Sequence, residues 1–237
     1  MLLIAVIVGA ALGALGAALN GASTWDEWLL WIIGGAIGAA LTVLTFGAFA
    51  YIAGASAAVV STVALVALVV WSAASLLGSI FTPLLDASDS KFLWGISFFL
   101  KWVQSPILTT VGLIAAIVVA AAGGNVDFRR GMLFIEVGAG GGALTLGAVA
   151  WTQSGRFKSD GTVPDELARH ESYHSRTVAA LGELGFYFTY VTVGAIWGAA
   201  QGGSWNDLNT MGCGNPFEKT AHTFTGDPAV AVSASSC

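Results

Sequence analysis

Long apolar runs, broken by short polar segments, fill the first half of the chain. Uncharged runs occupy residues 2–19, 28–53, 56–85 and 105–123. An α-helix rises 1.5 Å per residue, so about 20 apolar residues cross the hydrocarbon core of a bilayer. The pattern therefore predicts about four transmembrane helices, all within residues 1–124.

Two of the apolar segments allow a second interpretation. Residues 2–19 could be the core of a signal peptide, but a basic segment normally precedes such a core and none is present here. We therefore expect a retained helix. Residues 91–104 are short and aromatic with Lys91 and Lys101, which fits an interfacial helix or the outer end of the next span.

Glycines recur at helical spacing in the first two runs. Gly9 and Gly13 form one G-x-x-x-G motif, and Gly34 and Gly38 form another. In lipid such positions let two helix backbones approach closely, which predicts a hairpin of the first two helices and offers a surface for homo-oligomers. The alternative is that the spacing only reflects the abundance of glycine, of which the chain has 31.

The pattern changes from about residue 125. Residues 132–140 and 143–151 are short and β-capable, with glycines between them, and predict a β-hairpin. A polar loop follows. Pro164, with Asp165 and Glu166 behind it, then predicts the start of a helix that runs to about Leu181.

The rest of the chain is divided by composition. Residues 184–200 are apolar and uncharged, which fits a fifth, short membrane segment or a buried helix. Another helix is expected to open near Asn215. The expected fold is a mainly α membrane protein, with transmembrane helices in 1–124, a small α+β domain with a β-hairpin before the motif helix in 125–227, and a flexible tail in 228–237.

Composition supports a membrane location. Hydrophobic residues make up 56% of the chain and charged residues 10%, whereas soluble domains carry about 25% charged residues. The lipid bilayer is therefore the expected partner. The net charge of −5 and the scarcity of Lys and Arg argue against nucleic-acid binding.

The few charges also predict an orientation. Asp26 and Glu27 lie in the first loop, and Arg129 and Arg130 follow the fourth apolar run. Because basic residues favour the cytoplasmic side, both ends of the bundle and the C-terminal domain are expected in the cytoplasm.

One motif carries recognisable chemistry. His170, Glu171 and His174 form an H-E-x-x-H sequence on the predicted helix. Residues four apart share a helix face, so the two imidazoles can reach one zinc ion, and Glu171 can act as the general base on a water molecule. The alternative is a polar helix face with incidental histidines.

A third zinc ligand must come from elsewhere in the chain. Glu218 and His222 are four apart and could both face the site, while Glu183 is a weaker candidate near the end of the motif helix. Tyr187 or Tyr190 could donate a hydrogen bond to an oxyanion, the alternative being a core or interfacial aromatic.

Residues 132–222 resemble a known family. The H-E-x-x-H motif, the stretch Gly182–Tyr187, the segment Ala143–Gly147 and the N-P-F-E sequence ending at Glu218 are similar to small bacterial zincin-like membrane proteins. Related segments occur near the C-termini of Rhs and other polymorphic-toxin proteins. In zincins a β-hairpin precedes the motif helix, and its edge strand can hold an extended peptide.

The resemblance implies a gluzincin-like site in a bacterial inner-membrane protein. It makes Glu218 the third ligand beside His170 and His174. The usual polar Gln shortly after the second histidine is absent, and Ser175 to Thr177 stand there instead.

Two main hypotheses follow for function. The first is a membrane-anchored zinc metallopeptidase that cleaves a peptide or protein substrate with a metal-activated water. The alternative is a membrane-inserting toxin or effector component, in which the Gly-rich helices act and zinc is structural or secondary. A structural membrane protein with an inactive site is a third.

Overall fold

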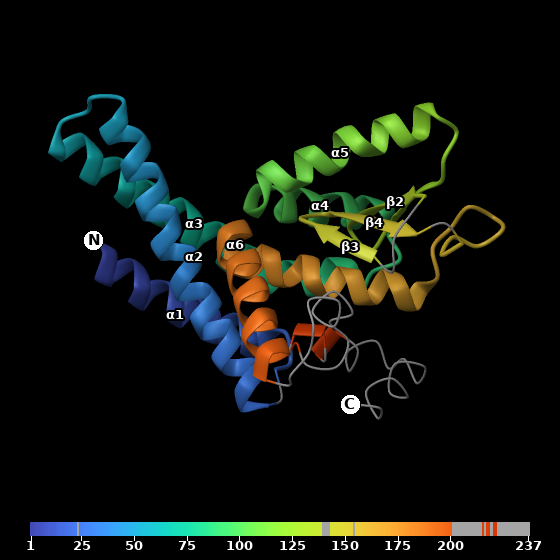
Figure 1. Ribbon diagram of the computed structural model, residues 1–237, viewed down its shortest axis with the longest axis horizontal. Coiled ribbons are helices and arrows are strands. Elements are labelled where there is room, and N and C mark those ends of the chain that lie inside the picture. Colours follow the sequence, from blue (N-terminus) through green and yellow to red (C-terminus); the bar gives the residue numbers. More distant parts are fainter. Residues whose placement is uncertain are drawn as a thin grey trace.

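The computed structural model describes residues 1–22, 24–138, 143–153 and 155–200, together with residues 215, 217, 218, 220 and 221. Within that part the chain forms six helices and one sheet of four strands (Figure 1). The fold is mainly α, as expected.

Three helices are long and apolar enough to cross a membrane. They are α1 (Leu2–Leu19), α2 (Trp25–Ile52) and α3 (Ala57–Asp86). The fourth predicted span corresponds to α5 (Pro106–Ala121), whose 16 residues extend only about 24 Å and so fall short of the hydrocarbon core. The three long helices indicate that the protein is membrane-associated.

Glycines hold α1 against α2. A Cβ atom on Gly9 would lie 2.2 Å from the carbonyl oxygen of Gly35, and one on Gly13 would lie 2.1 Å from that of Trp31. The hairpin predicted for the first two helices is therefore confirmed. The second glycine motif does something else, because Gly38 packs equally closely on the backbone of Leu181 in α6.

The sheet differs from the predicted hairpin. Its order is β1-β2-β4-β3, formed by β1 (Val126–Arg129), β2 (Met132–Val137), β3 (Ala143–Leu146) and β4 (Val149–Gln153). The expected pairing of 132–140 with 143–151 is wrong. The second segment folds back on itself at Gly147, whose φ is +63°, to form the β3–β4 hairpin, and β4 then pairs parallel to β2. A hairpin still precedes the motif helix.

The motif helix α6 (Asp165–Ala200) bends at one residue. Gly182 has φ 74° and ψ 161°, so the helix changes direction there, as the sequence predicted for its end near this glycine. In Figure 1 the first half runs beside the sheet, and the second half turns down along α2. The first half also packs on α3 and on α4 (Lys91–Gln104).

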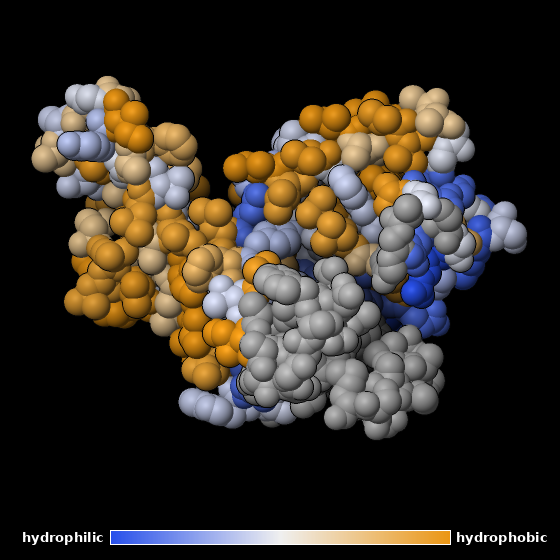
Figure 2. Space-filling view, in the orientation of Figure 1, coloured by the Kyte–Doolittle hydropathy of each residue, from blue (hydrophilic) through white to orange (hydrophobic). Residues whose placement is uncertain are grey.

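Apolar side chains cover most of the helical surface. Figure 2 shows them over α1–α3 and over the outer face of α5, while hydrophilic residues gather near the sheet and the start of α6. On α5 the exposed apolar residues fall at helical spacing, and the opposite face packs on β2 and β4. The helix α5 therefore lies over the sheet and presents an apolar face outward.

A candidate metal centre

Two histidines and a glutamate meet beside the sheet. The Nε2 atoms of His170 and His174 lie 3.1 Å apart, and each lies 3.2 Å from a carboxylate oxygen of Glu218. The three side chains are 14%, 6% and 13% exposed, in that order, so they are shielded but reachable. Glu218 thus comes to the motif from a segment outside α6.

The cluster has the dimensions of a zinc site. Ligand atoms at zinc bond lengths of 2.0–2.1 Å, placed at the corners of a tetrahedron, lie about 3.3 Å apart. The His170–His174 separation comes close to this value, each histidine lies 3.2 Å from a different oxygen of Glu218, and with one ligand atom from each residue all three lie within 4.8 Å of one another. Two imidazoles with one carboxylate are a common donor set for catalytic zinc. The other ring nitrogen of His174, Nδ1, is buried and has no hydrogen-bond partner among the described residues. The nitrogen of this ring that faces His170 and Glu218 is Nε2.

Packing brings Glu218 to the motif. The neighbouring Phe217 is buried against the rings of Phe186 and Tyr190 on α6. Thr220 donates a hydrogen bond of 2.8 Å to the buried carboxylate of Glu27 at the start of α2. Residues 217, 218, 220 and 221 are helical, as expected for this segment. The segment that carries Glu218 is therefore anchored both to α6 and to α2, which is a candidate membrane span.

Charges in the cluster stabilise one another. Burial favours the neutral acid, but His174 and His170 outweigh it and hold the pKa of Glu218 well below its usual range. Burial likewise disfavours a charged imidazole, yet the carboxylate of Glu218 raises the pKa of His174 above its usual value. Glu218 is thus ionised at neutral pH, the form in which a carboxylate binds a metal.

Glu171 lies next to the edge strand. Its side chain is buried, and Oε2 accepts a hydrogen bond from the hydroxyl of Thr145 on β3. Sequence reasoning did not select Thr145. The one signal was its place on a predicted strand before the motif helix, and nothing there distinguished it from its neighbours.

The two predicted oxyanion donors have other partners in this structure. The hydroxyl of Tyr190 donates a 2.5 Å hydrogen bond to Glu218 and so orients that ligand. The hydroxyl of Tyr187 accepts from the amide of Gly147 at 2.8 Å and donates to the carbonyl of Thr145 at 2.9 Å. Tyr187 therefore binds β3 and the turn that follows it, on the side away from β4 in the described sheet.

Of the two remaining ligand candidates, the structure describes Glu183. Glu183 faces α5, where its carboxylate accepts hydrogen bonds of 3.2 Å from the backbone amides of Ile107 and Leu108. It caps that helix and is not part of the metal cluster. His222 lies outside the described residues.

A buried ionic cluster supports the motif helix from behind. Asp86 at the end of α3 accepts hydrogen bonds from Lys101 on α4 at 2.9 Å and from Arg176 on α6 at 2.7 Å. The same carboxylate accepts from Ser172, which lies inside the motif, at 2.7 Å. Asp86 and Lys101 are 0% exposed. The one indication of this cluster in the sequence was that charged residues are rare throughout the chain.

The chain was compared with protein families, curated proteins and solved structures. No family model, curated protein or solved structure matches it.

Proposed function

We propose that the protein is a membrane-anchored zinc metallopeptidase. The observation that carries this proposal is the convergence of His170, His174 and Glu218, whose ligand atoms lie within 4.8 Å of one another, with Glu171 beside them and an edge strand next to Glu171. The helices α1–α3 anchor the centre to the bilayer. The sequence resemblance to bacterial zincin-like proteins points in the same direction.

Zinc bound by the three side chains would supply a Lewis acid that polarises the scissile carbonyl and lowers the pKa of a water to about 7. Glu171 accepts the proton of the attacking water and delivers it to the leaving amine. The hydroxyl of Thr145 fixes the direction of this carboxylate. Tyr190 keeps Glu218 in the ligand position.

The edge strand gives the substrate a place to bind. Within the part of the chain that the structure describes, β3 is the last strand of the sheet and pairs with β4 alone, and it lies against α6. An extended peptide can add to such an edge through its main chain, which would bring a peptide bond past Glu171. This favours a peptide as substrate over a small soluble ester.

The first test is metal content. The chain purified in mild detergent is expected to hold about one zinc per molecule after zinc is supplied and excess removed. His174→Ala and Glu218→Ala should lose the metal, and Glu183→Ala is the matched control because that carboxylate caps α5. A wild-type protein without zinc would end the proposal.

The second test is catalysis. Hydrolysis of a fluorogenic peptide library by the zinc-loaded protein should fall by at least about 100-fold in Glu171→Gln, whose zinc content should stay unchanged. Equal activity in both proteins would assign the hydrolysis to a contaminant. Permeabilisation of liposomes that survives His174→Ala, without any hydrolysis, would favour the toxin hypothesis instead.

A further inference from the structure

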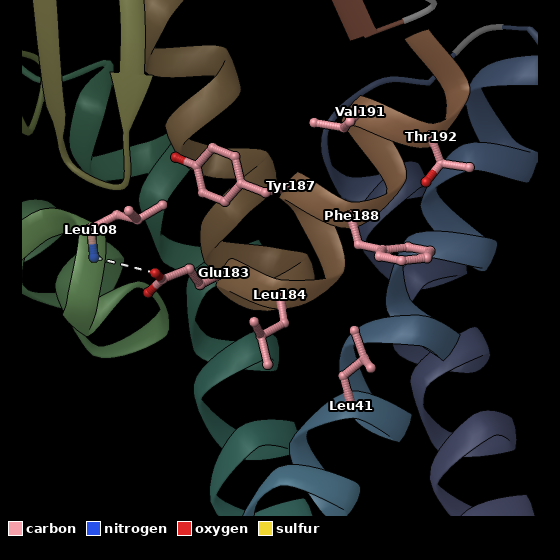
Figure 3. Close-up of a pocket in the computed structure, with 8 residues that line it drawn as sticks. All are labelled: Leu41, Leu108, Glu183, Leu184, Tyr187, Phe188, Val191 and Thr192. Atoms are coloured by element: carbon pink, nitrogen blue, oxygen red, sulfur yellow. Dashed lines mark hydrogen bonds between the residues drawn. The ribbon is translucent and has the colours of Figure 1, made fainter. Parts of the chain in front are cut away.

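An open groove lies between α2, the start of α5 and the second half of α6. Its volume is about 460 Å³, within the range of ligand sites, and it is lined mainly by apolar side chains. Figure 3 shows Leu41 of α2 facing Leu184 and Phe188 of α6 across this space. We call it the α2–α5 groove.

Of the polar side chains that line the groove, Glu183 and Tyr187 form hydrogen bonds outside it, and Thr192 adds one hydroxyl. The carboxylate of Glu183 faces the first amides of α5, and the dashed line in Figure 3 marks its bond to Leu108. The hydroxyl of Tyr187 is held by β3. An occupant therefore meets aliphatic and aromatic surface, which favours an apolar ligand over a charged one.

The groove is continuous with the membrane-facing surface. Phe188 and Val191 on its wall are 53% and 57% exposed, and Ile107 at the start of α5 is 69% exposed. One turn beyond Leu41, Leu44 of the candidate span α2 is 52% exposed. A molecule in the bilayer can thus reach the groove without crossing a polar surface.

Hydrogen bonds link one wall residue of the groove to the candidate centre. Tyr187 forms part of its wall and bonds to the carbonyl of Thr145, whose side chain in turn bonds to Glu171. Two hydrogen-bonded steps therefore separate the groove from the proposed general base.

The hydrogen bonds of Tyr187 favour a peptide as the occupant of the groove. Its hydroxyl accepts from one outward backbone amide of the β3 turn and donates to one outward carbonyl. An incoming extended chain makes this same pair of bonds to an edge strand, with its own carbonyl and amide. An acyl chain offers neither group.

We propose that the α2–α5 groove admits an apolar segment of a membrane-embedded peptide, whose main chain replaces the Tyr187 hydroxyl on β3. The proposal names the substrate class of the peptidase and so rests on the proposed function. The segment enters from the bilayer between α2 and α5. Its side chains fill the groove, and its backbone continues along the edge strand toward Glu171.

Binding can be tested without catalysis. The full chain carrying Glu171→Gln and a photo-crosslinking phenylalanine analogue at Phe188 is placed in nanodiscs with a single-span probe peptide. The probe has about 20 Leu and Ala residues between flanking lysines. It should crosslink at position 188, and the same analogue at Val70, an exposed lipid-facing site on α3, should yield at least about tenfold less peptide adduct.

Two variants separate this reading from random contact. Leu184→Trp fills the groove and should lower the adduct about tenfold, whereas Ile117→Trp, on the exposed face of α5, should leave it unchanged. Tyr187→Phe removes the competing hydroxyl and should raise it about two- to tenfold. Thermal unfolding of each variant shows that it is folded. Adducts with lipid alone, or no change in Leu184→Trp and Tyr187→Phe, overturn the inference.

The two proposals can fail separately. Zinc binding and cleavage of soluble peptides, with no groove-dependent adduct, would refute the groove and leave the peptidase standing. A groove-dependent adduct in a protein that binds no zinc and cuts no peptide would refute the peptidase and leave a binding groove for apolar peptides.

Discussion

Between α1 and α2 the closest contacts join a glycine to a backbone carbonyl, whereas around the motif helix they join charged and hydroxyl side chains. In lipid the first kind of contact stabilises through close van der Waals packing, because burial of apolar surface gives little advantage there. Burial of charged and hydroxyl side chains costs free energy unless every group has a hydrogen-bond partner, but such contacts hold the side chains in closely defined positions. The first region packs two candidate membrane spans together, and the second can hold several side chains in a fixed geometry.

The buried ionic cluster should be the most sensitive part of the second region. Asp86→Asn leaves Lys101 and Arg176 without their shared carboxylate, so the free energy of unfolding should fall by about 3–5 kcal/mol. Chemical unfolding in detergent micelles measures this. Asp89→Asn, three residues on and exposed, is the control and should change little. If Asp86→Asn and Asp89→Asn lowered the free energy of unfolding equally, the buried ionic cluster would not be the sensitive part of this region.

The glycine contacts test the first region. Gly13→Ala puts a methyl group against the backbone of Trp31, which cannot move far, and should lower the free energy of unfolding by about 1–3 kcal/mol. The same unfolding assay applies. An unchanged stability would show that α1 does not depend on close approach to α2.

Removal of one hydroxyl tests how the second region supports its ligands. Tyr190→Phe loses the hydrogen bond to Glu218 and should weaken zinc affinity about tenfold, with the protein still folded. Competition with a chelator measures the affinity. Tyr51→Phe, on an exposed residue of α2, serves as the control. Identical affinities in both variants would leave Glu218 independent of Tyr190.

The smallest effect should have the opposite sign. Gly95 lies within α4, and a Cβ atom there would meet nothing within 4 Å. Gly95→Ala should therefore stabilise the protein by about 0.5–1 kcal/mol, through the better helix propensity of alanine. A loss of stability here, like that at Gly13, would mean that the glycines act through flexibility rather than through space.

The helices were predictable because their signals are local. Uninterrupted apolar runs gave the three long helices, and Gly182 gave the bend in α6. The motif spacing put His170 and His174 on one face of a helix. These features depend on residues a few positions apart, for which helix geometry is a strong constraint.

The rest depends on contacts between distant residues. The parallel pairing of β2 with β4 follows from the tight turn at Gly147, and a segment read as one strand does not reveal it. Asp86 sits at a helix end, where a carboxylate usually meets water, so its burial beside Arg176 was not expected. Glu218 could be named as a candidate, but its position depends on Phe217 packing against α6.

The ionic cluster also affects the order in which the protein is assembled. Arg176 follows Asp86 by 90 residues, so a ribosome delivers α3 to the membrane well before the last partner of its terminal carboxylate exists. Lys101, 15 residues after Asp86, is its earlier partner. Until α6 arrives, Asp86 at the end of the candidate span α3 has Lys101 as a partner but lacks the hydrogen bond from Arg176. Docking of α6 brings Arg176 to Asp86 and places His170 and His174, and the later segment with Glu218 then completes the candidate centre by packing Phe217 on α6.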